Sequence, residues 1–190
     1  NTALSVVSDQ SDVRLVNLEG QSQTIPSAIF FGAEDHGVLF GRAAISAYKA
    51  RDEGRFMRSF KRALGTSLMS EGTTVGYKRL QFDEIIANFV SHVKSTAEAQ
   101  TGDELEQVVV GRPVHFVDGS DEKNRQAQSQ LEGIFKKSGF KDVRFQFEPI
   151  AAAFAHEAKL DDKEYMAVVL DIGGGTSDFS VIKLSQRYVN

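Results

Sequence analysis

Apolar residues come in short runs over the first forty residues of the chain, and polar turns separate these runs. Runs of this length predict β-strands, which we expect at 3–7, 13–16, 28–31 and 37–40. From Phe82 the apolar residues recur at spacings of three and four, which predicts a helix to about Gln100, ended near Gly102. A short helix is expected at 41–50, a solvated helix face in the basic segment 51–62, and a strand at 73–80.

Strand and helix patterns alternate in the second half of the chain. Strands are expected at 108–110, 143–147 and 166–170, and the first is predicted to be buried and parallel because it consists of three valines. One helix is expected from Asp121, as its cap, to Ser138, and another opens at Glu148-Pro149. This alternation predicts a layered α/β fold with a mixed sheet.

The most informative stretch, 168–182, is V-V-L-D-I-G-G-G-T-S-D-F-S-V-I, which predicts a strand, a tight glycine turn and a second strand. Glycines can adopt positive φ and let several backbone N–H groups converge on one anion. Thr176 adds a hydroxyl donor, while Asp171 and Asp178 can hold Mg²⁺ through water. A ligand-free hairpin would explain the glycines alone, but the flanking aspartates favour a phosphate site.

Composition excludes several classes of function. The 190 residues include no cysteine, so disulfides, thiol nucleophiles and Cys-ligated metals are excluded. Four scattered histidines lack metal-ligand spacing. The net charge of −4, without a Lys/Arg block, argues against nucleic acid as a partner, and no apolar run is long enough to span a bilayer.

Five ordered segments resemble the seventy-kilodalton heat-shock chaperone family of the actin-like ATPase superfamily. The family's second phosphate loop is similar to 170–178, and its N-E-P-T-A-A-A motif resembles F-E-P-I-A-A-A at 147–153. The other three matches are R-P-V-H-F at 112–116, N-R-Q-A-Q at 124–128 and K-R-A-L-G at 61–65. The departure G-R-P-V at 111–114 resembles a divergent bacterial branch of chaperone-like members.

The resemblance implies roles for particular residues. The implied catalytic residues are Lys61, Glu148 and Asp171. The implied nucleotide-binding residues are Gly173, Gly174, Gly175 and Thr176, with Asn1 and Thr2 as the tail of a first phosphate loop. The implied ligands of Mg²⁺, mostly through water, are Asp171, Glu148 and Asp178. The implied interlobe relay consists of Pro113 and Arg125.

Ordinary structural explanations remain open for four of these residues. Lys61 could be a surface lysine of the basic segment, and Glu148 could favour the dipole of its own helix. Pro113 could simply end a strand, and Arg125 could be an exposed helix arginine.

The fold that the resemblance implies is an actin-like (ribonuclease H-like) lobe, a mixed β-sheet flanked by helices, with a small α+β insertion. We expect the core at 1–35 and 79–164, the insertion at 36–78, and the opening hairpin of a second lobe at 165–190. ATP or ADP and Mg²⁺ are the implied cofactors, and the cytoplasm is the expected location.

The implied function is ATP hydrolysis coupled to motion between two lobes, which controls a site for unfolded peptide or a co-chaperone. We expect the 190-residue segment alone to be inactive. The alternatives are a sugar or acetate kinase with the actin-like core, against which the E-P-x-A-A-A match and the relay pair argue, and a non-catalytic filament-forming relative.

Overall fold

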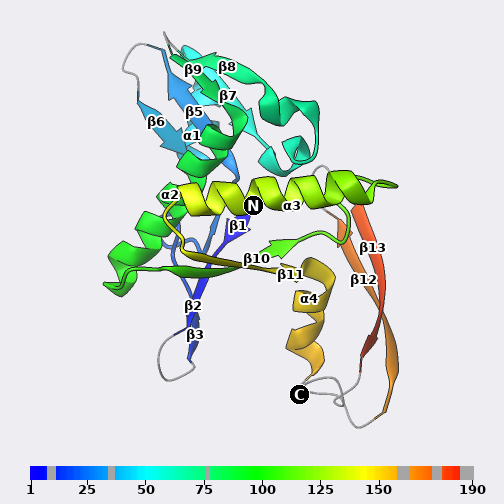
Figure 1. The fold of residues 1–190 in the computed structure, drawn as a ribbon. Coiled ribbons are helices and arrows are strands. Elements are labelled where there is room, and N and C mark those ends of the chain that lie inside the picture. Colours follow the sequence, from blue (N-terminus) through cyan, green and yellow to red (C-terminus); the bar gives the residue numbers. More distant parts are fainter. Residues whose placement is uncertain (8–11, 34–36, 76–77, 158–162, 173–176, 185–190) are drawn as a thin grey trace.

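The computed structural model describes residues 1–7, 12–33, 37–75, 78–157, 163–172 and 177–184. The strands are β1 (Thr2–Ala3), β2 (Ser5–Val7), β3 (Val13–Leu15), β4 (Thr24–Ile25), β5 (Ala28–Gly32), β6 (Val38–Phe40), β7 (Gly54–Arg58), β8 (Gly72–Val75), β9 (Lys78–Gln81), β10 (Gln107–Arg112), β11 (Asp142–Phe147), β12 (Tyr165–Ile172) and β13 (Ser177–Leu184). The helices are α1 (Gly41–Ala50), α2 (Phe82–Thr101), α3 (Asp121–Lys137) and α4 (Glu148–Glu157), with 3₁₀ turns η1 (Phe60–Ala63) and η2 (Ser67–Ser70). The chain is therefore a mixed α/β structure, as expected (Figure 1).

Strand β5 is the middle strand of the antiparallel sheet β6-β5-β7, and it is buried because a separate apolar cluster covers each of its faces. Its residues alternate between two cores, as the pleat of a strand requires. Ala28 and Phe30 pack with α1, whereas Ile29 and Phe31 join the main core. The sheet therefore joins strands from both sides of the predicted boundary at residue 35, which separates the expected core from the expected insertion. The division into subdomains stays a prediction.

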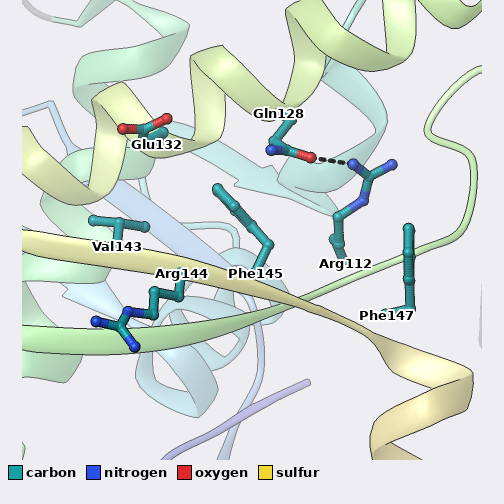
Figure 2. Close-up of a pocket in the computed structure, with 7 residues that line it drawn as sticks. All are labelled: Arg112, Gln128, Glu132, Val143, Arg144, Phe145 and Phe147. Carbon is teal, nitrogen blue, oxygen red and sulfur yellow. Dashed lines mark hydrogen bonds between the residues drawn. The ribbon is translucent and has the colours of Figure 1, made fainter.

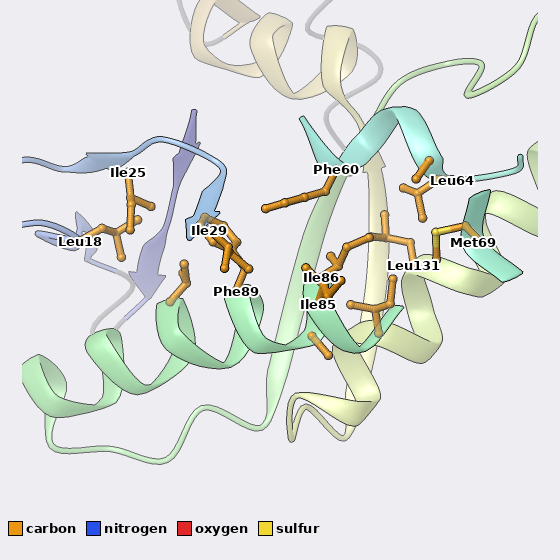
Figure 3. Packing of buried hydrophobic residues seen from close by; sticks show 14 of the residues in the cluster. Leu18, Ile25, Ile29, Phe60, Leu64, Met69, Ile85, Ile86, Phe89 and Leu131 are labelled. Atoms are coloured by element: carbon orange, nitrogen blue, oxygen red, sulfur yellow. The ribbon is translucent and has the colours of Figure 1, made fainter. Parts of the chain in front are cut away.

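The main core lies where α2 and α3 pack together with β5, η1 and η2 (Figure 3). Ile29 and Ile85 are fully buried there. Each such side chain stabilises the fold by about 1.5–3 kcal/mol relative to exposure. Helix α2 begins with a capping box between Gln81 and Glu84 and ends at Gly102, which has the left-handed φ of 79° that favours glycine. The predicted α2 is therefore confirmed almost to the residue.

Strands β10 and β11 pair in parallel, and their register joins Gln107 to Asp142 and Arg112 to Phe147. The parallel pairing confirms the expectation for 108–110. The expectation of full burial was wrong, because Val109 is 67% exposed. Helices α3 and α4 follow these two strands, and both pack against β11.

Three local predictions need correction. The stretch 73–80 is not one strand but the antiparallel pair β8–β9. The basic segment 51–62 is not one helix, because Arg51 ends α1 with φ of 64° and the chain then enters β7 and η1. The cap of α3 is Ser120, whose hydroxyl accepts a hydrogen bond from the Lys123 amide, and Asp121 is the first helical residue.

The predicted hairpin is formed by β12 and β13, which pair in antiparallel register and pack against α4 (Figure 1). Its outer face exposes apolar side chains from both strands: Met166, Val168, Leu170, Phe179 and Val181. None of the helices among the described residues combines the length and the apolar character that crossing a membrane requires.

Candidate functional site

The candidate site lies where the parallel strands β10 and β11 end. Because parallel strands run in the same direction, their carboxyl ends meet at one edge, which is the usual place for ligands in α/β proteins. Glu148 follows β11 directly and is the first residue of α4. Gly111 lies opposite, near the end of β10. A side-chain carbon at Gly111 would stand 3.4 Å from Cγ of Glu148. A single added carbon would therefore only touch Glu148, whereas a larger side chain at position 111 would crowd its carboxylate.

Lys61 reaches this edge from a distant part of the chain. It lies in η1, which is a single short turn held to the main core by Phe60 and Ala63. Its Nζ donates a hydrogen bond to Oε1 of Glu148, and the two form an ion pair. The side chains of Lys61 and Glu148 are 56% and 34% exposed. An ion pair this exposed stabilises a fold by only about 0.5 kcal/mol. The small contribution of this ion pair to the stability of the fold therefore gives little reason for Lys61 and Glu148 to pair.

The phosphate-loop residues predicted in the hairpin are only partly described. The positions 173–176, which hold the predicted Gly173, Gly174, Gly175 and Thr176, lie outside the described residues. Asp171 and Asp178 face each other in the register of β12 and β13, and nothing further is described of their side chains. The two strands that flank the loop are therefore confirmed, whereas the glycine turn itself lies outside the described residues and its ligand remains a prediction.

Asn1 and Thr2 lie at the other predicted phosphate loop. Thr2 pairs with Ile25 between β1 and β4, and its hydroxyl lies 2.9 Å from that of Ser27. Asn1 is exposed. No hydrogen bond joins Thr2 to Lys61 or Glu148 in the described part of the chain, and the first phosphate loop stays a prediction.

The predicted relay residues, Pro113 and Arg125, lie on either side of a loop that Asn124 holds in place by hydrogen bonds. Pro113 follows β10 directly, and Arg125 lies on the exposed side of α3. Between them, the buried Asn124 accepts hydrogen bonds from the amides of Phe116 and Val117 and donates one to the Val117 carbonyl. Both relay placements also agree with simple structural roles, and the relay stays a prediction.

Metal ligands were predicted at Asp171, Glu148 and Asp178. Within the described residues, no group of three or more His, Asp or Glu side chains gathers as a metal site would require. The carboxylate of Glu148 is described and has the hard oxygen that Mg²⁺ prefers. Mg²⁺ commonly keeps most of its waters, so one or two protein carboxylates are compatible with it.

Sequence reasoning missed three residues that build this edge: Gly111, Arg112 and Asn124. Arg112 is buried and donates hydrogen bonds to the carbonyls of Pro113 and Val114. Gly111 and Arg112 fall in the departure G-R-P-V at 111–114 and Asn124 opens the matched segment 124–128, but neither pattern indicates the contacts of these residues.

The sequence is similar to known proteins over nearly the whole chain. The sequence profile of the Hsp70 protein family matches residues 66–189. The chaperone protein DnaK of Ureaplasma urealyticum is 33% identical over 185 residues, which cover 97% of this chain and 28% of that protein. DnaK of Mycoplasmopsis agalactiae is 32% identical over 186 residues, which cover 98% of this chain and 29% of that protein.

The chain therefore spans less than a third of the length of these relatives. The family match begins just after η1 and Lys61. It includes Glu148 and the strands of the hairpin. The chain belongs to the Hsp70 protein family.

Proposed function

We propose that this chain is part of the nucleotide-binding module of a chaperone-like ATPase, in which Mg²⁺-dependent ATP hydrolysis occurs at the edge formed by β10 and β11. The observation that carries the proposal is the Lys61–Glu148 ion pair. It joins the two predicted catalytic side chains that the structure fully describes, although 87 positions separate them in the sequence.

Phosphoryl transfer needs cations and positioned carboxylates more than covalent chemistry. The Lys61 ammonium would hold the terminal phosphate and stabilise charge that develops on it. Glu148 and Asp171 would orient the attacking water, and the glycine turn 173–176 would donate backbone N–H groups to phosphate oxygens. Mg²⁺, held mostly through water by Glu148, Asp171 and Asp178, would supply further positive charge to the phosphates.

The ion pair also suggests how the site stays neutral without nucleotide. Lys61 and Glu148 neutralise each other, and both side chains are partly exposed. An arriving phosphate would compete for the ammonium, which frees the carboxylate for water or metal. Because the pair contributes only about 0.5 kcal/mol, opening it would place a small demand on binding.

We further propose that the chain has the actin-like lobe architecture, and that the nucleotide state passes outward through Pro113 and Arg125 to a site for unfolded peptide or a co-chaperone. Pro113 lies within two residues of Gly111, which faces Glu148. A displacement of Glu148 would therefore reach the relay loop over a short path. We expect the protein to act in the cytoplasm.

The test is phosphate release by the intact protein with ATP, with and without Mg²⁺. We expect turnover that needs Mg²⁺ and no added sugar or acetate. Turnover that appears only after sugar or acetate is added would favour the kinase alternative. A rise in light scattering on nucleotide addition, without turnover, would favour the filament-forming alternative.

A further inference from the structure

A buried guanidinium with neutral partners lies beside the proposed catalytic edge. Arg112 is the last residue of β10 and only 9% exposed. Its Nε and Nη2 donate to the carbonyls of Pro113 and Val114, each at 3.0 Å, and its Nη1 donates to Oε1 of Gln128 on α3 (Figure 2). No carboxylate of the described residues forms an ion pair with it.

Two aromatic rings complete the surroundings of this guanidinium. Its central carbon lies 5.0 Å from the ring centroids of both Phe116 and Phe147. Burial lowers the pKa of Arg112 from its ordinary value, yet arginine keeps its charge at physiological pH. A buried charge without a counter-ion is normally disfavoured, and an apolar residue of similar size often serves stability equally well. Stability therefore does not account for an arginine here.

The contacts of Arg112 join two segments that matter for the proposed site. On one side they fix the carbonyls of Pro113 and Val114, the start of the relay loop. On the other side lies Phe147, which pairs with Arg112 in the strand register and directly precedes Glu148. Figure 2 shows the Arg112 side chain between Gln128 and Phe147, with Arg144 projecting from the other side of β11.

We propose that Arg112 is a positioning residue, which clamps the Pro113 loop to the Phe147–Glu148 junction and so holds the Glu148 carboxylate toward Lys61. The planar guanidinium of Arg112 donates hydrogen bonds to three acceptors, and its contacts with the two phenylalanine rings hold its orientation. The clamp also ties the relay loop to the junction, so that neither moves alone. This inference rests on the proposed hydrolysis at Lys61 and Glu148.

The test uses Arg112→Met in the intact protein. Methionine keeps an unbranched apolar stem between the rings and removes all three hydrogen bonds. We expect ATP affinity to stay within about threefold while kcat falls by about tenfold or more, because a small misplacement of a catalytic group lowers the rate steeply. The matched control is Arg144→Met, which removes an exposed arginine from the opposite side of β11 and should leave kcat unchanged.

A second variant keeps the inference falsifiable if Arg112→Met does not fold. Gln128→Leu removes one acceptor and leaves Arg112 in place, and it should lower kcat by about threefold at unchanged ATP affinity. When Arg112→Met and Gln128→Leu are combined, the two reductions in kcat should not multiply, because both substitutions break the same set of contacts. Wild-type kcat in either folded variant would overturn the positioning role. A wild-type protein without ATP turnover would overturn the proposed function, and the inference with it.

Discussion

Lys61 and Glu148 form an ion pair between the turn η1 and the first residue of α4, at the edge where β10 and β11 end. Phe60 and Ala63 hold the turn of Lys61 to the main core, and α4, which begins at Glu148, packs against β10 and β11. The partial exposure of the pair leaves it accessible to a charged ligand.

We expect Lys61→Ala in the intact protein to lower ATP turnover by about a hundredfold or more, because the transferred phosphate loses its cation. ATP affinity should change by less than about threefold, since other groups hold the nucleotide. Turnover and calorimetric binding would both be measured. The control is Lys137→Ala, which breaks another exposed ion pair, with Asp83. Near-normal turnover in Lys61→Ala would remove Lys61 from the mechanism.

Gly111 should tolerate alanine better than valine. A single carbon at Gly111 would make ordinary van der Waals contact with Glu148, 3.4 Å from Cγ and 3.6 Å from Oε1. The two further methyl groups of valine need space that the carboxylate occupies. Turnover should stay within about twofold in Gly111→Ala and fall by about tenfold in Gly111→Val. Equal turnover in the two variants, with equal melting temperatures, would contradict this account.

Alanine substitution should have very different effects on stability at two neighbouring positions of α3, Asn124 and Arg125. Asn124→Ala leaves the half-buried amides of Phe116 and Val117 without their acceptor, and should lower the free energy of unfolding by about 1–3 kcal/mol. Arg125→Ala changes an exposed side chain and should alter it by less than about 0.5 kcal/mol. Denaturant unfolding measures both. If Asn124→Ala is as stable as Arg125→Ala, the loop does not depend on the hydrogen bonds that Asn124 makes to Phe116 and Val117.

The stability of the chain should depend on pH through Glu98. A hydrogen bond from Lys94 and another from the Leu105 amide lower the pKa of Glu98 below its ordinary value of 4.5. Its contribution is therefore complete above that value and is lost as the pH falls through the lower folded pKa. Glu98→Gln should lower the free energy of unfolding at pH 7 by about 1–2 kcal/mol.

The difference between wild type and Glu98→Gln should shrink as the pH falls through the lowered folded pKa of Glu98, below which the residue is protonated in both states. Glu132→Gln is the control, because Glu132 pairs with Lys136 on the exposed face of α3. A difference that does not shrink as the pH falls would show that charge is not the cause.

Local pattern was sufficient for most elements. The helical spacing from Phe82, the glycine at 102 and the proline after Glu148 predicted α2 and the start of α4, since caps and periodicity act within a few residues. The glycine run at 173–175 predicted the hairpin of β12 and β13. Where local cues were ambiguous, as at 73–80 and 51–62, neighbouring strands decided the outcome.

The sequence by itself determined which residues we propose to carry chemistry, because the motifs that resemble the family include Lys61, Glu148 and the glycine loop. Only the tertiary structure decided that Lys61 meets Glu148 and that Arg112 is buried between Phe116 and Phe147. These contacts join η1 to α4 and β10 to β11. Their geometry depends on how α2, α3 and the core pack, and that packing is not encoded in any short stretch of sequence.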